Sequence, residues 1–124
     1  MEVKNSLIYQ RLSNLSPFIR TLLYVHDGFV VGSGADYLIG NTETSPRDWD
    51  ILIPLSKWSV AMKSIPKGSA SNTFGGIKIN IDNVSVDVWS QDLSDYLVNL
   101  PVRNFSIVHP KTLTVLNGHQ SLSK

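Results

Sequence analysis

The chain has 124 residues, a formal net charge of +1 and no cysteine. This length fits one domain with a core of its own, and the near-neutral charge argues against a long nucleic-acid-binding surface. The lack of cysteine excludes disulfides, thiolate catalysis and sulfur-ligated metals. No apolar run approaches the roughly 18 residues of a membrane span, and the N-terminus lacks a signal-peptide core, so we expect a cytoplasmic protein without membrane contact.

Two helices are predicted at the N-terminus. Between Lys4 and Leu15 the apolar residues recur at helical spacing, at Leu7, Ile8, Leu12 and Leu15. Ser16 and Pro17 have the chemistry of an N-cap followed by a first-turn proline. A second helix is therefore expected to start there and to bury Phe18, Ile19, Leu22 and Leu23.

The next segment alternates between strands and turns. After a turn at Asp27-Gly28, the pattern predicts a strand at Phe29–Gly32 and a short helix at Ser33–Ile39 that ends at Gly40. The polar stretch Asn41–Arg47 is typical of a loop. A second strand is then predicted at Asp48–Ile53.

A helix and a hairpin follow this strand. Ser56 is expected to cap a helix that stops at Pro66 and carries Trp58, Met62 and Ile65 on one face. Lys67–Asn72 is predicted as a loop. Alternating apolar residues on both sides of Asp82-Asn83 then predict a β-hairpin, with Ile77, Ile79 and Ile81 on one arm and Val84, Val86 and Val88 on the other.

The C-terminal part is predicted to add a helix and two short strands. The helix spans Ser90–Leu100, with Leu93, Tyr96, Leu97 and Leu100 facing inward. The strands are Phe105–Val108 and Leu113–Leu116, and the polar tail from Asn117 is expected to fray. Together these elements predict a single α/β (α+β) domain in which a mixed β-sheet has helices packed on one side.

Two acidic residues interrupt the otherwise apolar strand at Asp48–Ile53. Because side chains alternate along a strand, Asp48 and Asp50 project from one face while Trp49 and the isoleucines project from the other. In the predicted hairpin, Asp87 likewise projects from the face opposite that of Val84, Val86 and Val88. If the two strands are neighbours, three carboxylates converge, and like charges that close repel unless they are protonated or bridged by a cation. Oxygen ligands favour Mg²⁺ or Mn²⁺ over Zn²⁺.

A Gly-Ser turn lies upstream of these carboxylates. Gly32, Ser33 and Gly34 follow a predicted strand and open a predicted helix, which is an arrangement suited to binding phosphate. The third glycine of a dinucleotide-binding fingerprint and the lysine of a P-loop are both missing. A tight strand-to-helix turn also needs such glycines for steric reasons, so the turn indicates a phosphate site only in combination with the acidic strand that follows it.

This order of motifs resembles the nucleotidyltransferase superfamily that includes DNA polymerase beta. The stretch VVGSGADYLIGN…RDWDILIP is most similar to the head domain of tRNA CCA-adding enzymes and bacterial poly(A) polymerases. NTFGGIKINIDNVSVDVW is similar to that family's Thr-Phe-Gly motif and its acidic hairpin, and RNFSI is more weakly similar to a later segment. The resemblance implies one minimal nucleotidyltransferase domain over 1–124, with N-terminal helices at 1–27, a catalytic core at 28–108 and a frayed tail at 117–124.

The resemblance also implies a reaction and a set of site residues. The expected activity is metal-dependent transfer of NMP from an NTP to a hydroxyl acceptor, with release of pyrophosphate. Asp48, Asp50 and Asp87 would be the catalytic and metal-binding residues, holding Mg²⁺ or Mn²⁺ as two ions. The nucleotide and its phosphates would be bound by Gly32, Ser33, Gly34, Arg47, Lys78 and Arg103.

The expected partners follow from this activity. The donor would be an NTP, with ATP or CTP favoured, and the acceptor an RNA end, a small molecule or a protein. A domain of this size with half a binding cleft is also compatible with a homodimer or a partner subunit. The alternative is a catalytically idle domain of the same fold that binds a nucleotide or a partner protein, as an antitoxin-like subunit would.

Overall fold

The computed structural model describes residues 2–67, 69–71, 75–99, 105–112 and 114–118. Its helices and strands follow the predicted order with small changes in their bounds. The described elements are α1 (Glu2–Ser13), α2 (Pro17–Tyr24), β1 (Phe29–Val31), α3 (Gly32–Leu38), β2 (Asp48–Ile53), α4 (Leu55–Met62), β3 (Ala70–Ser71), β4 (Ile77–Ile81), β5 (Val84–Ser90), α5 (Leu93–Val98), β6 (Phe105–His109) and β7 (Thr114–Gly118).

The strands form one mixed sheet in the order β3-β4-β5-β2-β1-β6-β7. The pairing of β2 with β5 is parallel, and the other pairings are antiparallel. The predicted hairpin is present as β4 and β5, with Ile81 opposite Val84 across the turn. Both residues of that turn have positive φ, Asp82 at 51° and Asn83 at 67°, and Asp and Asn tolerate this region better than most residues.

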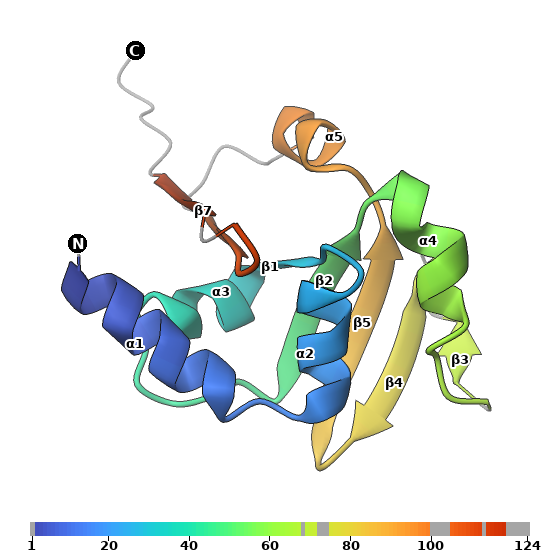
Figure 1. The fold of residues 1–124 in the computed structure, drawn as a ribbon, viewed down its shortest axis with the longest axis horizontal. Helices are drawn as coiled ribbons and strands as arrows, with labels where there is room; N and C mark the ends of the chain where they lie inside the picture. The colour runs from blue at the N-terminus through green and yellow to red at the C-terminus, as the bar shows by residue number, and fades with distance from the viewer. Residues whose placement is uncertain (1, 68, 72–74, 100–104, 113, 119–124) are drawn as a thin grey trace.

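Four helices cover one face of the sheet. In Figure 1, α1, α2 and α4 lie on the viewer's side of the strands. The fourth helix, α3, contributes to the same main core, which lies between the helices and the sheet. The helices contribute buried residues such as Leu12, Leu22 and Ala61, while β2 contributes Trp49 and Ile51 from below. The predicted mixed sheet is confirmed, and α1 to α4 pack on one side of it as expected, whereas α5 packs on the other.

A smaller apolar cluster lies on the opposite face. Phe29, Val31, Leu52 and Ile107 are buried there, and α5 packs against them through Leu93 and Tyr96. Leu97, predicted to face inward, is instead 38% exposed, because this helix has only two turns and presents a narrow apolar stripe. Leu100 lies outside the described residues.

Several element boundaries differ from the predicted ones. The strand β1 ends at Val31, and Gly32 begins α3 with a φ of 68°. The predicted loop at Lys67–Asn72 contains the short edge strand β3. The last strand, β7, extends to Gly118, so the first two residues of the predicted frayed tail are paired with β6, and 119–124 lie outside the described residues.

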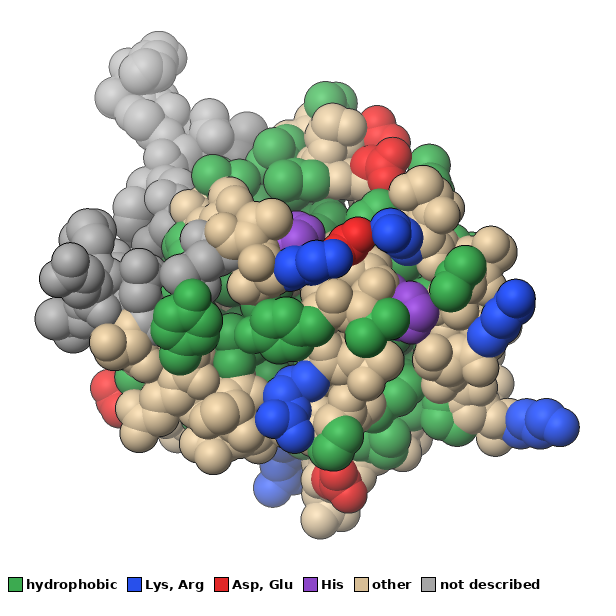
Figure 2. Space-filling model, viewed as in Figure 1, with side chains coloured by type: hydrophobic (Ala, Val, Ile, Leu, Met, Phe, Trp, Pro, Cys, Tyr) green, Lys and Arg blue, Asp and Glu red, His purple; other side chains and the backbone are tan. Residues whose placement is uncertain are grey.

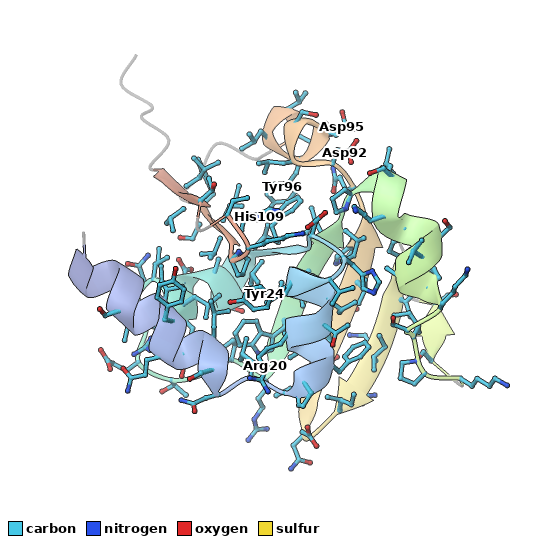
Figure 3. The ribbon with its side chains drawn as sticks, in the orientation of Figure 1. Arg20, Tyr24, Asp92, Asp95, Tyr96 and His109 are labelled. Carbon is cyan, nitrogen blue, oxygen red and sulfur yellow. The ribbon has the colours of Figure 1, made fainter. Side chains whose placement is uncertain are left out.

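The helix caps show one correct and one wrong prediction. Ser16 caps α2 as expected, since its side chain accepts a hydrogen bond from the backbone N–H of Ile19 at 3.3 Å. Ser56 does not cap α4, which already begins at Leu55. The N–H of Leu55 instead donates to a carboxylate oxygen of Asp92 at 2.8 Å. Asp92 precedes α5, so one side chain links the starts of two helices (Figure 3).

Arg11 attaches α1 to the loop that leads into β2. Its guanidinium donates to the carbonyl of Tyr37 and, at 2.8 Å, to that of Thr42, and it lies 4.2 Å from the centroid of the Tyr37 ring. A further ion pair reaches Glu43 at 3.6 Å. The loop is therefore held at its start by a helix that is distant in sequence.

Asp27, just before β1, contacts lysines from two other segments of the chain. Its carboxylate lies 2.8 Å from the ammonium of Lys111 and 3.4 Å from that of Lys57.

The helical face otherwise carries its basic side chains at scattered positions, with no continuous basic patch in this view (Figure 2). None of the helices in the described part of the chain has both the length and the apolar character needed to cross a membrane.

We predict that the Asp27 contacts make folding stability depend on pH. The hydrogen bond from Lys111 holds the pKa of Asp27 below its usual value. The stabilisation is therefore complete above the unfolded carboxyl pKa of about 3.9 and is lost as the pH falls through the folded value. Asp27→Asn should lower the unfolding free energy at pH 7 by about 0.5–1 kcal/mol, since solvent screens both lysines. Urea unfolding between pH 7 and pH 2.5 should show the difference shrinking below about pH 4.

Asp82→Asn is the matched control for this measurement. Asp82 also has a positive φ, but it is exposed in the hairpin turn and no ion pair is described for it. This substitution should change the unfolding free energy by less than about 0.5 kcal/mol at every pH. An equal pH dependence in both variants would show that the lysine contacts of Asp27 contribute nothing.

Candidate active site

The strand β2 separates apolar from acidic side chains. Trp49, Ile51 and Ile53 are 0–1% exposed beneath the helices. Asp48 and Asp50 project from the opposite face, where Asp48 is exposed and Asp50 is partly buried. The alternation predicted from the sequence is therefore present, and the face that carries the acids is the one that α1 to α4 leave uncovered.

The pairing of β2 with β5 brings the third carboxylate to this face. Asp50 and Asp87 are direct partners in the parallel register, and Asp48 is opposite Ser85. The side chain of Asp87 is 15% exposed. Strands in a sheet are about 4.8 Å apart, so the carboxylates of Asp50 and Asp87 are close neighbours. We call Asp48, Asp50 and Asp87 the carboxylate cluster.

Asp50 has an unusual electrostatic environment. Burial raises its pKa above the ordinary value, and the charges of Asp87 and Asp48 raise it further. The indole N–H of Trp89 opposes this rise by donating to Oδ1 of Asp50 at 3.2 Å. One oxygen of Asp50 is thus occupied by a neutral donor.

Lys78 contacts the other partly buried acid. Lys78 is on β4 and is the cross-strand partner of Asp87 on β5, and its ammonium lies 3.2 Å from Oδ2 of Asp87. The same ammonium donates to the hydroxyl of Ser85 at 3.2 Å. In the structure Lys78 is the counter-ion of a carboxylate, and the phosphate contact predicted for it stays a prediction.

The Gly-Ser turn lies beside the carboxylate cluster. A Cβ at Gly32 would be 3.6 Å from Oδ2 of Asp50, so this backbone approaches the oxygen that Trp89 leaves open. The exposed Ser33 donates through its hydroxyl to the backbone carbonyl of Asp48 at 3.4 Å. Gly32 and Ser33 therefore adjoin the acids on β2.

Gly34 has a different environment from the other two turn residues. It is buried, and a Cβ there would be 2.4 Å from a ring carbon of Trp49. Close packing of α3 against Trp49 thus requires glycine at this position. The structure supplies a steric reason for Gly34 and does not place it at the open face with the acids.

The two arginines predicted to bind phosphate have separate outcomes. Arg47 is exposed, and its side chain makes no ion pair with the described part of the chain. Its carbonyl accepts a hydrogen bond from the N–H of Ser85 at 2.7 Å, which continues the pairing of β2 with β5. Arg103 lies outside the described residues.

The carboxylate cluster is not a preformed metal cage. Among the described residues, no group of three His, Asp or Glu side chains is arranged to hold a metal ion. Asp48 and the open oxygen of Asp50 nevertheless offer the donor chemistry of a Mg²⁺ site, because Mg²⁺ is usually held by one or two carboxylates together with substrate phosphates. The residues fit an ion that is bound jointly with a nucleotide.

Two aromatic residues near Asp50 complete the site. Trp89 lies two residues after Asp87 on β5, and its indole N–H donates to Asp50, a contact that no local sequence pattern indicates. Tyr96 extends from α5 toward the sheet (Figure 3), and its pKa is raised by burial and by the charge of Asp50. Helical spacing identified Tyr96 as an inward residue but could not predict that α5 packs beside β2.

Comparisons with known proteins support the fold. No model of a known protein family matches the sequence, and no curated protein matches it. In a search of solved structures, the chain is similar to a protein described as "The complex structure of CCA-adding enzyme with CTP", with a TM-score of 0.56 and 18% sequence identity. The match covers 87% of this chain and 31% of that one. At this level of identity the likeness shows a nucleotidyltransferase-like fold.

We predict that Asp50 lowers stability at neutral pH. Because its pKa is raised in the folded state, the unfolding free energy falls as the pH rises from the unfolded carboxyl pKa through the folded value. Asp50→Asn keeps the shape and removes the charge. It should raise the unfolding free energy at pH 7 by about 0.5–2 kcal/mol, measured by chemical denaturation.

The exposed neighbour on the same face is the control. Asp48→Asn should change the unfolding free energy by less than about 0.5 kcal/mol. A less stable Asp50→Asn variant at pH 7 would contradict the prediction, since it would mean that the charge of Asp50 is favourable where it lies.

Proposed function

We propose that the chain is a nucleotidyltransferase that moves NMP from an NTP to a hydroxyl acceptor and releases pyrophosphate. The observation that carries this proposal is the register of β2 with β5. It puts Asp50 opposite Asp87 on the open face, with Asp48 on the same strand. Three neighbouring acids repel one another unless positive charge is supplied, and a divalent cation held between them and the phosphates of a nucleotide would supply it.

The triphosphate would lie between the Gly-Ser turn and β2. Gly32 gives the backbone room to approach it, and the exposed hydroxyl of Ser33 can donate a hydrogen bond. Arg47 immediately precedes the acidic strand, and its exposed guanidinium is available to neutralise phosphate charge. These residues adjoin the acids without requiring any change in the fold.

The reaction makes one bond and breaks one. The acceptor oxygen forms a bond to the α-phosphorus, while the bond from that phosphorus to the bridging oxygen breaks and pyrophosphate leaves with its electron pair. The acceptor proton needs a base, and the carboxylate of Asp87 beside Asp50 is the candidate. In-line displacement of this kind depends mainly on positioning and on charge stabilisation.

Asp48 and Asp50 would hold Mg²⁺, or Mn²⁺ in its place. When bound, the ion stabilises negative charge on the transferring phosphoryl oxygens. The open oxygen of Asp50 faces Gly32, so the protein directs this ligand toward the phosphate end of the site.

CTP and ATP are the first donors to test. The similar solved structure is described as containing CTP, and this chain corresponds to 31% of the length of that protein. The acceptor classes are an RNA 3′ end, a small-molecule hydroxyl and a protein side chain. All three present the same attacking atom.

Transfer of label tests the proposal. Each α-³²P-labelled NTP is incubated with Mg²⁺ and each acceptor class, and the label is followed by electrophoresis and chromatography. Wild type should label one acceptor class. The isosteric variant Asp48→Asn/Asp50→Asn should lose more than about a hundredfold in rate, since groups that stabilise transition-state charge are worth that much.

Asp82→Asn is again the control, because it removes one exposed acid from a turn outside the cluster. Calorimetry of Mg²⁺-dependent NTP binding gives an independent measurement. If wild type and the double variant bind NTP equally, with and without Mg²⁺, the catalytic proposal is wrong. The domain would then be better described as an idle nucleotide-binding or partner-binding module.

A further inference from the structure

Lys78 is fixed beside Asp87 by the sheet itself. The two residues are cross-strand partners in the antiparallel pairing of β4 with β5. The ammonium of Lys78 lies 3.2 Å from Oδ2 of Asp87 and 3.2 Å from the hydroxyl of Ser85. Ser85 and Asp87 point to the same face of β5, so the ammonium spans two side chains on that face. Backbone register therefore keeps Lys78 within reach of Asp87.

The carboxylate oxygens of the cluster differ in whether a hydrogen-bond donor already contacts them. Oδ1 of Asp50 receives the indole N–H of Trp89, and Oδ2 of Asp87 receives the ammonium of Lys78. Oδ2 of Asp50 faces Gly32, and Asp48 is exposed beside it. Of these four positions, the two without a described donor, Oδ2 of Asp50 and the carboxylate of Asp48, are both on β2, at the side where the phosphates would lie.

We propose that the cluster takes one divalent cation, at Asp48 and Asp50, and that the ammonium of Lys78 supplies the positive charge at Asp87 that a second cation would otherwise supply. This inference rests on the proposed function and specifies how its site is charged. It assigns Lys78 as a positioning residue that acts on Asp87.

Simple electrostatics supports the exclusion of a second ion. Mg²⁺ lies 2.0–2.1 Å from its ligand oxygens, so an ion on Oδ2 of Asp87 would occupy the space of the ammonium. Two like charges a few ångströms apart repel strongly at a partly buried site.

Manganese stoichiometry tests the inference. Wild type, Lys78→Met and Lys111→Met are dialysed to equilibrium against Mn²⁺ with saturating α,β-methylene-ATP or α,β-methylene-CTP, and bound metal and bound nucleotide are both measured. Wild type should bind one Mn²⁺ per bound nucleotide, and Lys78→Met should bind two. Lys111→Met removes an equal charge from the ion pair with Asp27 and should match wild type.

A second readout does not require nucleotide. The affinity for Mn²⁺ alone, followed by the electron paramagnetic resonance signal of free Mn²⁺, should increase by about fivefold or more in Lys78→Met, since a nearby positive charge is gone. Lys78→Arg keeps the charge and should retain the stoichiometry of wild type. Circular dichroism checks that each variant is folded, and Lys78→Gln replaces Lys78→Met if the latter is not.

The outcomes separate this inference from the proposed function. Two Mn²⁺ per nucleotide in wild type, or one in both wild type and Lys78→Met, would overturn the role of Lys78 while leaving nucleotidyl transfer intact. The double variant Asp48→Asn/Asp50→Asn is measured alongside. If wild type binds no more Mn²⁺ with nucleotide than this double variant does, the proposed function itself is wrong and this inference falls with it.

Discussion

The parallel pairing of β2 with β5 is the constraint on which the candidate site depends. Its register makes Asp50 and Asp87 direct neighbours and sets Asp48 opposite Ser85. A slip of one residue would turn the side chains of one strand to the other face, placing the acids of β2 in the core and Trp49 in solvent. Because that slip is so unfavourable, the hydrophobic face fixes the geometry of the polar one.

Packing beneath the sheet supplies the energy that holds this register. Trp49 and Ile51 on β2 and Val86 on β5 are 0–1% exposed under the helices, and each buried side chain of this size stabilises the fold by about 1.5–3 kcal/mol. Gly34 lets α3 approach the Trp49 ring closely. The helical face thus offsets the cost of the partly buried Asp50, while α5 covers only part of the opposite face.

The features predicted correctly from the sequence are those with local causes. Side-chain alternation assigned the two faces of β2, the Ser16-Pro17 cap located the start of α2, and the Asp82-Asn83 turn located the hairpin. In each case the signal lies within a few residues of the structure it specifies. The nucleotidyltransferase-like fold could be recognised because these local signals occur in a characteristic order.

The features that the sequence did not reveal depend on contacts between distant segments. Asp92 caps α4 from 37 residues away, and Trp89 donates to Asp50 across 39. Arg11 reaches Thr42, which is 31 residues distant. Even Lys78 and Asp87, nine residues apart, were predicted as separate site residues because their contact depends on the hairpin register. Such pairs become visible only after the sheet order is known, because no local pattern specifies which segments meet.

Charge connects the stability of the fold to its proposed activity. Burial and neighbouring acids make the ionised form of Asp50 costly, and Trp89 and Lys78 reduce that cost without removing it. In the proposed function, a cation bound by Asp48 and Asp50 would relieve the remaining repulsion, so part of this unfavourable free energy would be recovered on binding. By linkage, a ligand that binds only the folded state also stabilises it. The position that makes the charge of Asp50 unfavourable for folding is therefore the one that would favour a cation there in the proposed function, and the packed helical face allows the protein to tolerate it.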